Sequence, residues 1–201
     1  FDVFSSAGAV AYAVGGAVRD SLLGREVHDW DVASPFRPEV TAELFASRGF
    51  KVIPTGIRHG TVTVLSHGMP VEVTAFRIDG SYSDSRHPDR VEFTDRVEED
   101  LARRDFTVTA MAYPPVRGLC DPWNGQADLK AGVIRCVGDP STRFAEDALR
   151  ILRAFRFAAQ LGFTIDGATL KAAAASERLS SISVERIAAE TEKILLSPSP
   201  A

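Results

Sequence analysis

Two aspartates separated by a single residue, Asp29 and Asp31, are the first candidates for chemistry in this sequence. Residues two apart on a strand point to the same face, so both carboxylates are expected on one side, with Trp30 and Val32 turned to the core. Carboxylates are the side chains with which proteins hold Mg²⁺ against a phosphate group. The pattern therefore predicts a metal site on one face of a strand.

A glycine pair, Gly15 and Gly16, stands before the aspartates, between an apolar run at 12–14 and the stretch AVRDSLLG. Glycine lets backbone N–H groups approach a phosphate closely, and the N-terminus of a helix favours an anion. Arg19 adds a positive charge on the expected helix. Each feature alone is common in turns and caps, but together with the aspartate pair they predict a site for a nucleoside triphosphate and its Mg²⁺.

The elements expected to position these groups combine strand and helix periodicities, which indicates an α+β fold. The run at 12–14, the helix after the glycines and the strand at 29–32 are followed by a helical pattern. Further strands are expected where short apolar runs lie between glycine-containing turns. The helical pattern spans 39–48, and the further strands span 51–54, 61–66 and 71–76.

Glu72 alternates with Val71 and Val73 in the last of these strands. If both valines face the core, Glu72 projects to the other face, where it can lie beside the aspartate pair. A solvent-facing glutamate on a half-exposed strand explains the same pattern equally well.

From residue 142 the pattern becomes helical, and a helix is expected to run to Gly162, followed by helices at 167–178 and 184–196. Four charged residues recur at every third position of the first helix and form a slowly rotating polar stripe. Pairing of such charges on a solvated helix face is the ordinary explanation. The four residues are Asp147, Arg150, Arg153 and Arg156.

Composition narrows the class of protein. The formal net charge of −4 over 201 residues argues against a surface built for nonspecific nucleic-acid binding. No run of about 18 apolar residues is present that could span a membrane. Two cysteines, Cys120 and Cys136, have no metal-like spacing and fit a reduced, cytoplasmic protein.

The pattern GG-x-VRD-x-LLG-R-x-x-x-D-x-D resembles the class II tRNA nucleotidyltransferase and bacterial poly(A) polymerase family, which belongs to the polymerase-β-like nucleotidyltransferases. The resemblance implies a head over residues 1–138, with a small sheet flanked by helices, and an all-helical neck over 139–201. Since family members continue into body and tail domains, and position 1 is not methionine, we expect a head-and-neck fragment.

The resemblance also implies roles for residues elsewhere in the chain. Glu72 matches a third catalytic carboxylate beside Asp29 and Asp31, and the segment 77–96 resembles the flexible loop of CCA-adding enzymes. In RRD-x-T, Arg104 matches a nucleotide contact and Asp105 an acid near the ribose, while Thr109 stands where asparagine is usual. In ED-x-x-R and the residues after it, the acid and the first arginine match base-reading groups, and the later arginines lie near phosphates; these are Asp147, Arg150, Arg153 and Arg156.

The activity implied by the resemblance is Mg²⁺-dependent transfer of CMP and AMP, from CTP and ATP, to the 3′ end of tRNA with loss of pyrophosphate. The segment TGIRHGTVTV resembles the CCA-adding members. Two alternatives stay open at this stage. One is an A-adding enzyme or poly(A) polymerase, and the other is a catalytically inactive nucleotide- or RNA-binding module.

Overall fold

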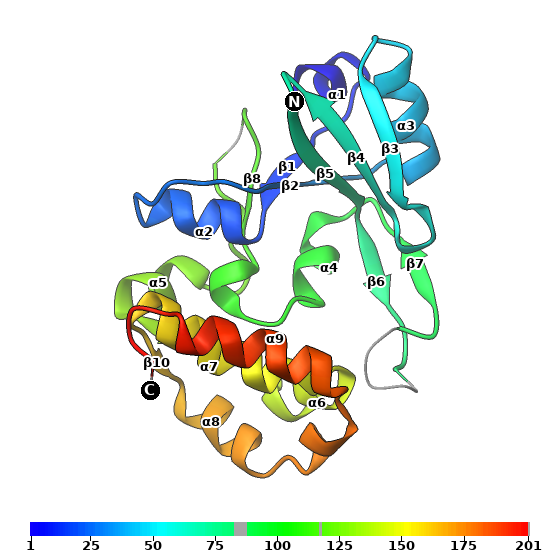
Figure 1. Ribbon diagram of the computed structural model, residues 1–201. Coiled ribbons are helices and arrows are strands. Elements are labelled where there is room, and N and C mark those ends of the chain that lie inside the picture. The colour runs from blue at the N-terminus through cyan, green and yellow to red at the C-terminus, as the bar shows by residue number, and fades with distance from the viewer. Residues whose placement is uncertain (83–87, 117, 201) are drawn as a thin grey trace. The chain divides into compact units, whose positions relative to one another are not determined.

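The computed structural model describes residues 1–82, 88–116 and 118–200 and consists of two compact units (Figure 1). Unit 1 comprises residues 1–79, 91–103 and 109–122, and unit 2 comprises residues 80–90, 104–108 and 123–201. The middle of the expected loop, residues 83–87, lies outside the described residues. The domain boundary expected at residue 138 stays a prediction.

Unit 1 is built on a six-stranded sheet with the order β3-β4-β5-β2-β1-β8. Neighbouring strands are antiparallel, except that β2 and β5 are parallel. The five strands predicted from short apolar runs are present, β8 is an additional strand that was not predicted, and the α+β class is confirmed. The strands are β1 (Tyr12–Val14), β2 (Trp30–Ser34), β3 (Lys51–Gly56), β4 (Thr61–Ser66), β5 (Met69–Ala75) and β8 (Ala112–Tyr113).

One face of this sheet is covered by α1 (Asp2–Ser6) and α3 (Pro38–Ala46) (Figure 1). Phe4 of α1 and Phe45 of α3 meet edge to face and pack against inward-pointing valines of β2, β4 and β5. Trp30 was expected in this core with Val32, but it is 39% exposed because it is the first residue of β2 and lies outside the packed cluster. The strand residues of opposite parity, Asp31 among them, point to the other face of the sheet.

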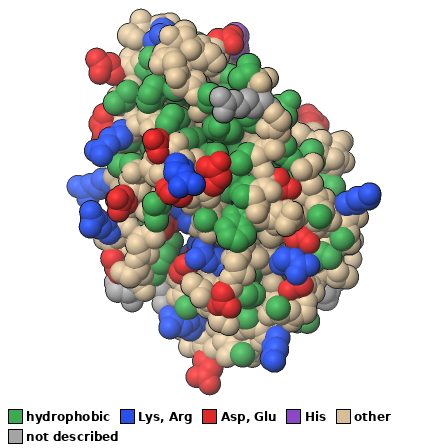
Figure 2. Space-filling view, turned by 180° about the vertical axis from the view of Figure 1, so that it is seen from behind, with side chains coloured by type: hydrophobic (Ala, Val, Ile, Leu, Met, Phe, Trp, Pro, Cys, Tyr) green, Lys and Arg blue, Asp and Glu red, His purple; other side chains and the backbone are tan. Residues whose placement is uncertain are grey.

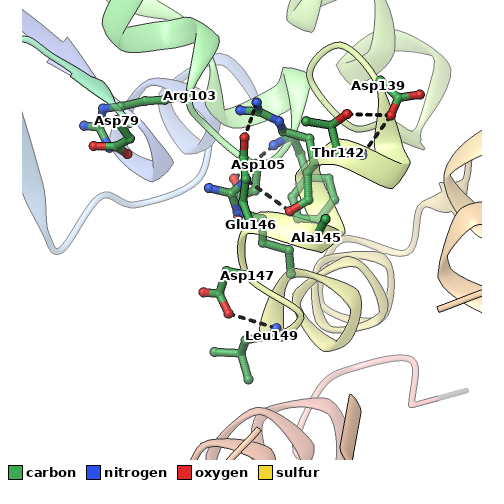
Figure 3. Close-up of polar contacts among 12 residues, drawn as sticks. Asp79, Arg103, Asp105, Asp139, Thr142, Ala145, Glu146, Asp147 and Leu149 are labelled. Atoms are coloured by element: carbon green, nitrogen blue, oxygen red, sulfur yellow. Dashed lines mark hydrogen bonds and ion pairs between the residues drawn. The ribbon is translucent and has the colours of Figure 1, made fainter. Parts of the chain in front are cut away.

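A hairpin of β6 (Arg77–Asp79) and β7 (Val91–Phe93) is tied to α4 (Val97–Ala102) by buried charges. Arg103 donates to Asp100 at 2.7 and 2.9 Å and pairs with Asp79 at 3.4 Å, where Figure 3 shows the two side chains together. The side chains of Asp100 and Asp79 are 1% and 4% exposed. Buried carboxylates are tolerated only when they are paired in this way.

We expect Asp100→Asn to lower the free energy of unfolding of the chain by about 3 kcal/mol, because it leaves the Arg103 guanidinium without its principal partner. Urea unfolding followed by circular dichroism measures the change. Asp95→Asn alters an exposed carboxylate near the same helix and should change stability by less than about 0.5 kcal/mol. Equal effects of the two substitutions would show that the buried pair contributes nothing.

Unit 2 consists mainly of helices. They are α5 (Gly125–Ala131), α6 (Pro140–Glu146), α7 (Leu149–Leu161), α8 (Gly167–Ala174) and α9 (Val184–Leu195), with two short parallel strands, β9 (Val133–Ile134) and β10 (Thr164–Ile165). The continuous helix expected from residue 142 to Gly162 is wrong, because Asp147 has an extended backbone and separates α6 from α7. The expected end at Gly162 is confirmed, where φ of 71° gives the left-handed cap that glycine adopts without strain.

The surface carries both signs of charge. On the face shown in Figure 2, Lys and Arg side chains are interspersed with Asp and Glu side chains, as the small net charge predicts. Within the part of the chain that the structure describes, none of the helices has the length and apolar character needed to cross a membrane.

Candidate active site

Asp31 and Glu72 are brought side by side by the parallel pairing of β2 and β5, in which their Cα atoms are direct partners. Directly paired residues point to the same face, and neighbouring strands lie about 4.8 Å apart. Both side chains therefore project from the sheet face opposite α1 and α3. Asp31 is half-buried and Glu72 is exposed, so a ligand can reach both carboxylates.

Asp29 lies just before β2 and outside the paired part of the sheet, and its side chain is exposed. It therefore has no fixed sheet partner comparable to that of Asp31, and its place beside Asp31 stays a prediction. Among the described residues, no group of three or more His, Cys, Asp or Glu side chains is arranged to hold a metal ion. The donors that the sheet does position are two carboxylates, which suit Mg²⁺.

The glycine turn lies at the end of β1, whose Val14 is paired with Asp31. Gly15 has φ of 70° and ψ of −136°, a conformation that side-chain-bearing residues avoid, and it forms the N-cap of α2 (Gly16–Leu22). Arg19 donates two hydrogen bonds to Asp20, at 2.7 and 2.8 Å, and its Nη2 lies 3.6 Å from the Cβ position of Gly16. The predicted strand, glycine turn and helix are thus present, with a guanidinium held beside the turn.

In unit 2, the half-buried Arg104 and the buried Asp105 begin a segment that contacts α7. Asp105 accepts a hydrogen bond from Arg153 Nε at 2.7 Å and another from the backbone N–H of Phe106 at 3.0 Å. The charge of Asp105 raises the pKa of Arg153 above its ordinary value, although burial opposes the shift. Arg153 therefore stays charged and fixes this segment to the helix.

Asp147 occupies the break between α6 and α7 instead of a helix face (Figure 3). Its Oδ1 accepts the backbone N–H of Leu149 at 3.0 Å, and its Oδ2 accepts from Arg186 of α9 at 3.0 Å. The backbone N–H of Arg150 donates to the carbonyl of Asp147 at 3.0 Å, so the two residues stand one turn apart although Asp147 is not inside the helix. A carboxylate has about four lone-pair sites, so these bonds leave it able to accept another donor.

The three arginines of the expected stripe lie on α7, but each engages a different acidic residue. Arg150 pairs with Glu146, four residues earlier, and Arg153 pairs with Asp105. Arg156 pairs with Glu190 at 2.6 Å and lies 4.1 Å from the ring centroid of Phe157. Burial lowers the pKa of Arg156, and the charge of Glu190 opposes that shift.

Three acidic and basic partners of these side chains were not among the sequence candidates. Glu146 lies four residues before Arg150, a helical spacing that could have indicated the pair. Arg186 and Glu190 belong to α9, which is distant in sequence, so no local pattern connects them with α7.

Two protein-family models match this chain. A family model described as the poly A polymerase head domain matches residues 11–135, and a model described as the probable RNA and SrmB-binding site of polymerase A matches residues 162–201. The chain belongs to the poly A polymerase head domain family. This confirms the resemblance drawn from the glycine and aspartate motifs, and it identifies the fold as a polymerase-β-like nucleotidyltransferase head.

Individual relatives are CCA-adding enzymes. The chain is 50% identical over 191 residues to the CCA-adding enzyme of Leuconostoc mesenteroides, covering 94% of this chain and 47% of the relative. The Lactobacillus helveticus CCA-adding enzyme is 50% identical over 193 residues, covering 96% of this chain and 47% of that enzyme. The chain thus spans about half the length of the curated relatives that it matches.

Solved structures of CCA-adding enzymes also resemble this chain. The crystal structure of the Bacillus stearothermophilus CCA-adding enzyme in complex with CTP matches 98% of this chain and 47% of that chain, with a TM-score of 0.88 and 42% identity. The Thermotoga maritima CCA-adding enzyme complexed with tRNA matches 98% of this chain and 46% of that chain, with a TM-score of 0.80 and 30% identity.

Proposed function

We propose that this chain is the nucleotide-binding and catalytic part of a CCA-adding enzyme. It would transfer CMP and AMP, from CTP and ATP, to the 3′ end of tRNA and release pyrophosphate. The observation that carries the proposal is the pairing of Asp31 with Glu72 on the sheet face opposite α1 and α3, in a chain whose relatives are CCA-adding enzymes. A cytoplasmic location, where tRNA is available and Cys120 and Cys136 stay reduced, belongs to the same proposal.

The carboxylates at this site would hold Mg²⁺ together with the nucleotide. Magnesium is usually bound by one or two protein carboxylates plus phosphate oxygens, so the Asp31–Glu72 pair fits without a third fixed ligand. When bound, the metal supplies charge stabilisation for the attacking and leaving oxygens. Asp29 is proposed as a further metal ligand, and Glu72 is proposed to face the 3′-hydroxyl of the RNA.

The glycine turn would receive the triphosphate. Backbone N–H groups at Gly15 and Gly16 can approach phosphate oxygens because no side chain covers them, and Arg19 contributes charge beside them. Arg104 is proposed to contact the nucleotide and Asp105 to lie near its ribose. Arg153 and Arg156 are proposed to act near phosphates. Their guanidinium groups would then bind phosphate oxygens in addition to, or in place of, their present partners Asp105 and Glu190.

Base selection is proposed for Asp147 and Arg150. Cytosine and adenine both present an exocyclic amine beside a bare ring nitrogen, whereas uracil and guanine present a carbonyl oxygen beside a ring N–H. A carboxylate accepts from the amine and a guanidinium donates to the bare nitrogen. The remaining acceptor capacity of Asp147 is compatible with this role.

An A-adding enzyme or poly(A) polymerase is the second candidate, because the family model that the chain matches is described as a poly A polymerase head domain. Incubation of the chain with labelled CTP or ATP, Mg²⁺ and tRNA lacking its terminal CCA separates the candidates on one gel. Addition of both nucleotides in the order C, C, A supports the proposal. Addition of A alone would favour the second candidate, and binding without addition would favour an inactive module.

We expect the chain to bind CTP and ATP but to extend tRNA at least about tenfold more slowly than a full-length relative. Its net charge of −4 provides little general attraction to RNA, and fewer phosphate contacts mean weaker binding. Calorimetric titration measures nucleotide binding, and primer extension at matched concentrations measures transfer. Equal rates and equal tRNA affinities would show that these 201 residues suffice for transfer.

A further inference from the structure

A pair of threonine hydroxyls lies on the same sheet face as the carboxylates. Thr55 Oγ1 of β3 and Thr63 Oγ1 of β4 are 2.9 Å apart, within hydrogen-bond distance. The register of β3 and β4 shifts between Ile53 and Gly56, which marks a β-bulge. In a regular pairing Thr55 would stand opposite Thr61, but the bulge places Gly56 there instead, and the Thr55 hydroxyl meets that of Thr63.

This hydroxyl pair is adjacent to Glu72. Thr63 is the direct Cα partner of Glu72 in the antiparallel pairing of β4 with β5, so the two side chains share a face at a Cβ separation of about 4.5–5.5 Å. Along one row across the sheet, the order is therefore Val14, Asp31, Glu72, Thr63, Ile53. The glycine turn lies at the Val14 end of this row, and the threonine pair lies on the β4 side of Glu72, away from that turn.

That order assigns a direction to the reaction. In phosphoryl transfer the attacking and leaving oxygens are roughly in line on opposite sides of the phosphorus. If the triphosphate occupies the turn at Gly15, pyrophosphate leaves toward β1, and the attacking 3′-hydroxyl arrives from the side of β4. The terminal ribose of the RNA then lies above the threonine pair.

We propose that Thr55, held in place by Thr63, determines specificity for RNA by hydrogen bonding to the 2′-hydroxyl of the terminal ribose of the strand that is extended. The proposal rests on the proposed function. Thr63 is 7% exposed whereas Thr55 is exposed, so Thr55 presents the hydroxyl that a ligand can reach. A threonine hydroxyl both donates and accepts, as does the 2′-hydroxyl that distinguishes RNA from DNA.

The test compares two RNA strands that differ only in the terminal sugar, ribose or 2′-deoxyribose, each with a free 3′-hydroxyl. For the unaltered chain, we expect kcat/KM to be about tenfold higher and Kd about tenfold lower with the ribose-ended strand. A factor of about ten is the usual effect of one hydrogen bond. For the ribose-ended strand, Thr55→Val should lower kcat/KM about tenfold and raise Kd about tenfold, and both constants for the deoxyribose-ended strand should stay unchanged. The ratio between strands then falls to about one.

Thr74→Val is the matched control, because Thr74 forms the neighbouring hydroxyl pair with Thr61 at 2.9 Å but is not the strand partner of Glu72. It should leave the ratio between strands unchanged. An equal loss for both strands in Thr55→Val, or an unchanged ratio, would overturn the sugar assignment. Absence of nucleotide addition by the unaltered chain would refute the proposed function instead, and the Kd ratio would still decide whether Thr55 senses the 2′-hydroxyl.

Discussion

Replacement of Asp31 by asparagine is expected to reduce nucleotide transfer by at least about 10²–10³-fold, the usual loss when one group that stabilises transition-state charge is removed. Asp31 is half-buried and lies directly beside Glu72. Because asparagine has nearly the same shape as aspartate, the fold should persist. Primer extension at saturating Mg²⁺ measures the rate, and urea unfolding confirms the fold. Asp29→Asn should reduce nucleotide transfer by a similar factor if Asp29 is the further metal ligand.

Glu39→Gln provides the control for Asp31→Asn. Glu39 is an exposed carboxylate in the first turn of α3, the helix that covers the opposite face of the sheet. The substitution removes the same charge from the same unit and should leave transfer within about twofold of the unaltered rate, since surface changes of this kind have little effect. Full Mg²⁺-dependent turnover by the Asp31 variant would refute the assignment of the active site to this sheet face.

Asp147→Ala is expected to narrow the preference for C and A over U and G by about 5- to 150-fold, because a good paired contact to a base edge discriminates by about 1–3 kcal/mol. Arg150→Ala should have the same effect, since both side chains are needed to match the amine and the bare nitrogen. The side chain of Arg156 is proposed to act near phosphates, so Arg156→Ala should weaken the binding of all four nucleotides about equally. Competition among the four nucleotides in single-addition assays measures the preference.

Asp139→Ala separates base reading from helix capping. Asp139 caps α6 by accepting the backbone N–H of Thr142 at 2.7 Å, much as Asp147 accepts that of Leu149 (Figure 3). Loss of a cap costs about 1 kcal/mol of stability and should leave the base preference unchanged. If Asp147→Ala slows all four nucleotides by one factor, as a cap variant would, its role is structural.

Local patterns predicted most of the scaffold. Short apolar runs placed β1 to β5, and apolar spacing placed α3 and α9, because burial on one face imposes a period that the sequence displays; β6, β7 and β8 were not predicted. The break at Asp147 escaped this reasoning, because apolar residues on both sides keep a helical spacing. At the break, Asp147 accepts the backbone N–H of Leu149 and pairs with Arg186 of α9, and the second of these is a tertiary contact that no local pattern displays.

The grouping of the candidate site residues could be predicted only where they lie close together in sequence. Gly15, Gly16, Arg19 and Asp31 lie in one stretch, so their grouping followed from local spacing. Alternation left the orientation of Glu72 undecided, and the register of β2 against β5 decided it. Thr55 and Thr63 both lie in the segment TGIRHGTVTV, but no local spacing pairs their hydroxyls, because the contact depends on a bulge that shifts β3 by one residue against β4.

The parallel pairing of β2 and β5 also has a kinetic consequence. Helix α3 and strands β3 and β4 intervene between these two strands in sequence, so Asp31 and Glu72 become neighbours only after a long segment has been ordered. Non-local pairings form late, since the entropy of loop closure must be overcome before their contacts stabilise the chain. During refolding, the carboxylate pair should therefore assemble after the β4–β5 hairpin, and hydrogen exchange should protect β4 before β2.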